Sequence, residues 1–106
     1  KVLTPISSSS VYDVVIHNQK EFLKVQVKST SDLEKGSDCY RFNIGRGNSS
    51  KLRYKSSDID YFALYIISLE LFYIIPVNKL KTRSIRVYPN KKHKYNKYIN
   101  AWGLLK

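Results

Sequence analysis

Three side chains on two neighbouring predicted strands have the types that phosphodiester hydrolysis requires. Asp13 is an isolated acid in the first strand, and Gln26 and Lys28 lie two residues apart in the second. Mg²⁺ prefers oxygen donors and keeps several waters, so one or two protein oxygens and a substrate phosphate complete its coordination. Asp13 supplies a carboxylate, Gln26 an amide oxygen and Val27 its main-chain carbonyl. Lys28 then favours hydroxide and stabilises charge developing on the phosphate oxygens.

The alternation of side chains along a strand brings these residues together. Lys24, Gln26 and Lys28 share one side of their strand, because strand side chains alternate with a period of two. A two-residue turn between the strands places Asp13 opposite Lys24, and a register shifted by one pair places it opposite Gln26. Opposed residues share a face, so both registers bring Asp13, Gln26 and Lys28 to one patch. The alternative is an ordinary exposed hairpin, because the bare pattern is common in unrelated sequences.

Residues 12–15 and 25–30, the segments around these side chains, resemble the core of the PD-(D/E)XK nuclease superfamily. The resemblance is closest to a branch in which glutamine replaces the second acid, as in certain homing endonucleases encoded in group I introns. By this resemblance, Asp13 and Gln26 are metal-binding positions, Lys28 is the catalytic lysine, and the cofactor is Mg²⁺ or Mn²⁺ in its place. The segments that carry it are spread over most of the chain: 12–15, 25–30, 58–65, 72–76 and 98–102.

The resemblance also implies a fold class, α/β (α+β), with a restriction-endonuclease-like mixed β-sheet core flanked by helices. That fold opens with a helix that often contributes a further glutamate, and no such segment is present. We therefore expect residues 1–106 to form a single nuclease-like domain that lacks its N-terminal helix.

The alternation of apolar residues predicts six strands and little helix. Leu23, Val25 and Val27 form an apolar face that we expect to be turned to a core. A helical turn is predicted at 76–81, and the spacing of aromatic and apolar residues predicts an amphipathic helix over 94–105. The predicted strands are 11–16, 21–30, 39–44, 61–67, 71–75 and 84–88.

Positive charge is concentrated in the last third of the chain. Of a formal net charge of +11, residues 71–106 contribute nine Lys and Arg with no acid. Such a segment fits phosphate neutralisation, in which each basic contact displaces a condensed counterion; the alternative is a disordered basic tail or general solubility charge. The glycine-containing loop 45–55 is also basic, whereas 31–38 is acidic and is interpreted as a solvent turn. The predicted nucleic-acid-binding residues are Lys24, Arg46, Lys51, Arg53, Lys55, Lys91, Lys92 and Lys94.

The remaining sequence features concern the cellular location and the assembly of the protein. Cys39 is the single cysteine and is interpreted as a buried strand residue, which fits a reducing intracellular location, cytoplasmic or nucleoid-associated. The apolar run 61–75 is too short and interrupted to span a membrane. Its aromatic residues are expected to form core or subunit contacts rather than base-stacking platforms, which predicts a homo-oligomer, dimer or tetramer. Asp58 and Asp60 are interpreted as capping a turn rather than as a second carboxylate site.

Two function classes follow from these observations. The first is a divalent-metal-dependent endonuclease acting on double-stranded DNA, of a homing or other site-specific type. The second is a non-catalytic nucleic-acid-binding module on the same fold. The intact trio Asp13, Gln26 and Lys28 favours the enzyme, because a protein that has lost catalysis usually loses at least one such residue. A role on RNA is a weaker third alternative.

Overall fold

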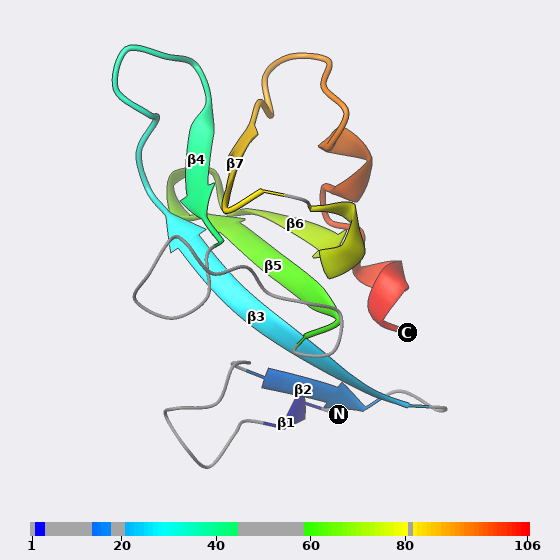
Figure 1. The fold of residues 1–106 in the computed structure, drawn as a ribbon. Coiled ribbons are helices and arrows are strands. Elements are labelled where there is room, and N and C mark those ends of the chain that lie inside the picture. Colours follow the sequence, from blue (N-terminus) through cyan, green and yellow to red (C-terminus); the bar gives the residue numbers. More distant parts are fainter. Residues whose placement is uncertain (1, 4–13, 18–20, 45–58, 81) are drawn as a thin grey trace.

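The chain folds around a five-stranded mixed sheet with a separate two-stranded sheet packed beside it (Figure 1). The computed structural model describes residues 2–3, 14–17, 21–44, 59–80 and 82–106. In the five-stranded sheet β3 and β5 are parallel and the other pairs are antiparallel. Its strands, in spatial order, are β1 (Val2–Leu3), β2 (Val14–His17), β3 (Phe22–Thr30), β5 (Tyr61–Ile66) and β6 (Leu71–Pro76).

The second sheet is the antiparallel pair of β4 (Tyr40–Asn43) and β7 (Ser84–Val87). The described helices are all short 3₁₀ helices: η1 (Ile67–Leu69), η2 (Val77–Lys79), η3 (Asn96–Tyr98) and η4 (Trp102–Leu105). None of them has the length and apolar character needed to cross a membrane. The predicted mixed-sheet core is confirmed, and in the described part of the chain short 3₁₀ helices take the place of the expected flanking helices.

The sheet separates two apolar clusters. The larger cluster fills the space between β5, β6 and the β4–β7 pair, and includes Phe42, Phe62, Tyr73 and Val87. The smaller cluster lies on the opposite face and is closed by the C-terminal segment. Its buried members are Leu23, Val25, Ala63, Ile74 and Leu105. Because β3 contributes to the smaller cluster and β5 to both, the centre of the sheet is covered on both sides.

The prediction for the apolar face of β3 is wrong at one residue. Leu23 and Val25 are buried as expected, but Val27 is 37% exposed, whereas Gln26 is only 9% exposed. Val27 pairs with Ala63, whose methyl side chain is small, and the smaller cluster does not extend to it. The polar face of β3 is therefore the better covered one at this point of the strand.

The predicted C-terminal helix over 94–105 is also wrong. Residues 96–98 and 102–105 form the two separate 3₁₀ helices, and between them Ile99 is extended and forms an antiparallel bridge with Tyr73. Asn100 has a left-handed φ of 49°, and its main-chain N–H donates to the Phe72 carbonyl at 2.8 Å. Hydrogen bonds to β6 thus compete successfully with a helix. The turn predicted at 76–81 is present as η2.

Tyr73 offers a direct test of how this core is packed. Its side chain is fully buried, and its hydroxyl has no hydrogen-bond partner among the described residues. Burial raises the pKa of Tyr73 from 10.0 to about 12. An unsatisfied buried hydroxyl destabilises the folded state, so Tyr73→Phe should raise the free energy of unfolding by about 1 kcal/mol at neutral pH. Urea unfolding measures this difference.

The same substitution should remove a loss of stability in alkaline solution. Between pH 10.0 and about 12 the unfolded parent releases the phenolic proton of Tyr73 while the folded parent retains it, so its stability falls as the pH rises. Tyr73→Phe lacks this contribution, and its advantage over the parent should widen near pH 11. A less stable Tyr73→Phe at both pH values would show that the hydroxyl makes a stabilising contact.

Candidate active site

β3 positions Gln26 and Lys28 on one face of the main sheet. In the parallel ladder with β5, Gln26 lies beside Phe62 and Lys28 beside Leu64. Phe62 and Leu64 belong to the larger cluster, so the two polar side chains of β3 lie on the side of the sheet that the β4–β7 pair covers. Gln26 is buried and Lys28 is half-buried. The charge of a half-buried ammonium such as that of Lys28 is screened less by solvent than an exposed charge, which increases its effect on a bound phosphate.

The register of β2 and β3 is the shifted one of the two predicted registers, the one from which Asp13 was predicted to lie opposite Gln26. His17 lies opposite Phe22, and Val14 lies opposite Val25. The described part of the ladder therefore ends at the pair of Val14 and Val25. Gln26 is the next residue after Val25 on β3, and Asp13 is the residue before Val14 in the sequence. Asp13 itself lies outside the described residues. The same is true of four predicted DNA contacts, namely Arg46, Lys51, Arg53 and Lys55.

Asp60 fixes the position of β3 relative to β5 close to Gln26. The main-chain N–H of Lys24 donates to Asp60 Oδ2 at 2.8 Å, and the Asp60 N–H donates back to the Lys24 carbonyl at 2.8 Å. The Asp60 carbonyl also accepts a hydrogen bond from Val77 N–H at 3.1 Å. The Asp60 side chain therefore accepts a hydrogen bond from a main-chain N–H, as expected for a structural acid. The donor is not in the turn that Asp60 was predicted to cap, because it belongs to Lys24 of β3, 36 residues away. Lys24 is half-buried beside this contact.

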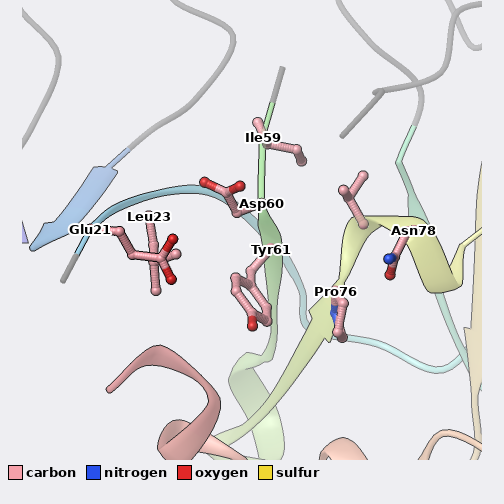
Figure 2. Close-up of a pocket in the computed structure, with 8 residues that line it drawn as sticks. Glu21, Leu23, Ile59, Asp60, Tyr61, Pro76 and Asn78 are labelled. Carbon is pink, nitrogen blue, oxygen red and sulfur yellow. The ribbon is translucent and has the colours of Figure 1, made fainter. Parts of the chain in front are cut away.

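A cavity of about 240 Å³ opens next to Asp60 (Figure 2). It contains two carboxylates, of Glu21 and Asp60, and it does not include Gln26 or Lys28. Because its lining comes from the starts of β3 and β5 and the end of β6, the cavity lies at the junction of these three strands and not at the candidate active site. Its lining residues are Glu21, Leu23, Ile59, Asp60, Tyr61, Pro76, Val77 and Asn78.

The oxygen donors of β3 fit a hard divalent cation. Gln26 provides an amide oxygen and Val27 a main-chain carbonyl at adjacent positions, and both are donor types that Mg²⁺ accepts. In the described part of the chain, no group of three or more His, Cys, Asp or Glu side chains is placed to hold a metal ion. A metal at β3 therefore depends on neutral oxygens together with a carboxylate from outside the described residues.

The basic segment near the C-terminus is folded rather than a disordered tail. Asn96 Nδ2 donates to the Lys91 carbonyl at 2.7 Å, and the Lys94 ammonium lies 5.0 Å from the centre of the Tyr95 ring. Lys92 and Lys94 are exposed. Lys91 forms an ion pair with Asp38 at 2.8 Å, whose hydrogen bond raises the pKa of Lys91 and lowers that of Asp38.

The acidic segment 31–38 is more than the solvent turn predicted for it. Glu34 Oε1 accepts a hydrogen bond from Arg86 Nε at 2.9 Å, and its Oε2 lies 3.6 Å from Arg41 Nε. The hydrogen bond from Arg86 lowers the pKa of the Glu34 carboxyl, and the charges of both arginines act in the same direction. Sequence reasoning missed this cluster, because Glu34 and Arg86 are 52 residues apart. Cys39 is buried, as predicted, with its Sγ 3.2 Å from the hydroxyl of Ser37.

The fold and the polar pair of β3 together define a class of protein, a nuclease-like domain built on a mixed sheet. A family model of PD-(D/E)XK endonucleases matches residues 1–105, and the chain belongs to this family. Among solved structures it is similar to the bacterial homing endonuclease I-Ssp6803I, with 28% sequence identity and a TM-score of 0.75. That similarity covers 98% of this chain and 74% of the homing endonuclease. No curated protein sequence matches the chain.

Proposed function

We propose that this protein is a divalent-metal-dependent endonuclease that hydrolyses phosphodiester bonds of double-stranded DNA. Its family and its structural similarity to a homing endonuclease support endonuclease activity. The observation that carries the finer proposal is the placement of Gln26 and Lys28 on one covered face of β3, where the family resemblance assigns metal-binding and catalytic roles. Similarity to a homing enzyme also favours cutting at specific sites over general degradation.

In this proposal each side chain has a distinct task. Asp13 and Gln26, with the Val27 carbonyl, hold Mg²⁺ or Mn²⁺, which when bound lowers the pKa of water and offsets phosphate charge. Gln26 is neutral and buried, so it orients an oxygen without adding negative charge beside the DNA. The Lys28 ammonium lies two residues further along the same face and stabilises negative charge on the phosphate oxygens in the transition state.

Incubation of supercoiled plasmid with purified protein, with and without Mg²⁺, tests the proposed function. We expect nicked and linear products only with the metal, and a chelator should stop the reaction. Retention of plasmid binding without any cleavage in Mg²⁺ or Mn²⁺ would instead support the non-catalytic binding module. Cleavage of single-stranded RNA in preference to the plasmid would contradict the assignment of the substrate.

The basic surface predicts a strong dependence of DNA affinity on salt. If five or six phosphates are contacted, affinity should fall by roughly three orders of magnitude between 50 and 200 mM salt, because each contact releases counterions. Replacing Lys92 and Lys94 by alanine should weaken binding to all duplex sequences alike and make the salt dependence shallower. Adding Lys91→Ala should have a smaller further effect, because Lys91 is already paired with Asp38.

Fluorescence anisotropy over a salt series measures this dependence. Lys35→Ala is a suitable control, since Lys35 is exposed in the acidic segment and its loss removes the same charge. An affinity that does not change with salt would contradict phosphate contacts and with them the proposed substrate.

We further propose that two copies of the chain associate through an aromatic face of the main sheet. Tyr65 and Phe72 stack at 4.3 Å between ring centres, and Trp102 meets Phe72 edge-on at 4.9 Å. Trp102 is 43% exposed, and Val27 is exposed on the same side of the sheet. These residues are uncharged, so copies of a chain with net charge +11 can approach there with least repulsion. A monomer at micromolar concentrations in light scattering would contradict this proposal.

A further inference from the structure

The β4–β7 pair is a two-stranded ribbon with sharply different faces. Tyr40 and Phe42 of β4 and Ile85 and Val87 of β7 are buried in the larger cluster. The alternate positions point the other way: Arg41, Asn43 and Arg86 are exposed and Ser84 is half-buried. Figure 1 shows the ribbon standing beside the β3–β5–β6 part of the sheet, at the end away from β1 and β2.

The ladder of the ribbon brings its outward residues into direct pairs. Arg41 lies opposite Arg86, and Asn43 lies opposite Ser84. Two arginines in direct opposition repel each other and by themselves destabilise a sheet. Their side chains are 48% and 51% exposed. The outer face therefore presents four adjacent hydrogen-bonding side chains on a ribbon whose inner face is buried in the larger cluster.

Glu34 holds the two arginines without using all of their donors. Both contacts are made at Nε, at 2.9 Å for Arg86 and 3.6 Å for Arg41. A guanidinium has five N–H donors, four of them on its terminal Nη atoms, so each arginine retains a set of donors for a ligand. The carboxylate offsets the repulsion between the arginines and limits their rotamers, which reduces the entropy lost when they bind.

The residue types on this face match those that read base edges. Arginine binds the N7 and O6 acceptors of guanine in a bidentate manner, asparagine binds adenine in the same way, and serine bonds to either. The major groove of B-DNA is about 12 Å wide and admits a two-stranded ribbon, whose strands lie about 4.8 Å apart. A ribbon with one buried and one base-reading face therefore has the size and the chemistry for this groove.

We propose that the outer face of the β4–β7 ribbon enters the major groove and reads the DNA sequence, with Arg41 and Arg86 on guanines and Asn43 on an adenine. This inference rests on the proposed function, since it assumes a duplex DNA substrate. The inner face of the ribbon packs on the side of the sheet that carries Gln26 and Lys28, and β3 and β4 are in contact. The bases that are read consequently lie at a fixed distance from the bond that is cut.

Selection from a randomised duplex DNA library tests the proposal with charge-conserving variants. The parent should enrich a motif containing guanines. Arg41→Lys and Arg86→Lys keep the charge but lose the bidentate fork, so each should reduce discrimination at its guanine by roughly 5- to 150-fold. Lys92→Ala is the contrasting variant, because it should weaken binding to all duplexes and leave the motif intact. An unchanged motif in both arginine variants, or no motif in the parent, would overturn the proposal.

A modified base then distinguishes the groove that is read. Replacing a selected guanine by 7-deazaguanine removes the N7 acceptor in the major groove, and it should weaken parent binding without further weakening the variant that has lost that contact. If the modified duplex binds the parent as well as the unmodified one, the ribbon does not read the major groove. Glu34→Gln should broaden the motif, because the arginines lose their positioning carboxylate, and should tighten binding to random duplex.

Plasmid nicking separates this proposal from the proposed function. The arginine variants should still nick plasmid in a metal-dependent manner at high protein concentration, because their site at β3 is intact. Metal-dependent nicking with an unchanged motif rejects only the ribbon, whereas the absence of nicking by the parent rejects the endonuclease itself.

Discussion

Lys28→Ala is expected to reduce DNA cleavage by on the order of 10²-fold or more while leaving duplex binding nearly unchanged. The reason is that Lys28 is proposed to stabilise charge that appears only in the transition state, so its loss changes the rate and not the affinity. Lys28 is half-buried on β3, beside Leu64 of β5. Single-turnover cleavage of a labelled duplex at saturating protein measures the rate, and anisotropy measures the binding.

Two further variants sharpen the interpretation of this result. Lys35→Ala removes the same charge from an exposed position in the acidic segment and should cleave at the parent rate. Asp13→Asn should lose cleavage by weakening metal occupancy, and part of that loss should be recovered at higher metal concentration. If Lys28→Ala and Asp13→Asn both cut DNA as fast as the parent, the assigned site is wrong.

Gln26 is expected to tolerate a change to glutamate but not to alanine. Gln26→Glu keeps an oxygen ligand and should retain measurable cleavage, whereas Gln26→Ala removes the ligand and should abolish it at limiting metal. Because the parent ligand is neutral, the parent site should hold Mg²⁺ weakly until a DNA phosphate joins the coordination. Cleavage rates over a metal titration test this expectation, and full activity of Gln26→Ala at limiting metal would contradict a ligand role.

The burial of Gln26 adds a test that does not depend on catalysis. A carboxylate at this position is removed from water, so without metal Gln26→Glu should be less stable than the parent. Binding of Mg²⁺ to the folded state stabilises it by mass action, so added metal should raise the melting temperature of Gln26→Glu more than that of the parent. Equal shifts in the two proteins would indicate that residue 26 does not contact the ion.

The sequence by itself determined most of the strands and the grouping of the polar residues on β3. Alternation with a period of two is a local property, and it correctly placed Gln26 and Lys28 on one face and predicted the bounds of β3, β4 and β7 within one residue. The burial of Cys39 was predicted correctly as well. The family resemblance, carried by short segments throughout the chain, was confirmed by the family match.

Only the tertiary structure decided which faces of the strands are covered and whether residues 94–105 form one helix. Gln26 is buried because the β4–β7 ribbon, whose second strand is distant in sequence, covers the polar side of the sheet. Val27 is exposed because the smaller cluster on the other side does not extend to it. The aromatic and apolar residues of 94–105 are spaced as in an amphipathic helix. Ile99 and Asn100 nevertheless pair with the main chain of Tyr73 and Phe72 on β6, which interrupts the helix. The Glu34–Arg86 contact and the Asp60–Lys24 contact span 52 and 36 residues, and no local pattern encodes such pairs. Local periodicity fixes the direction of a side chain, but its neighbours are set by packing between distant segments.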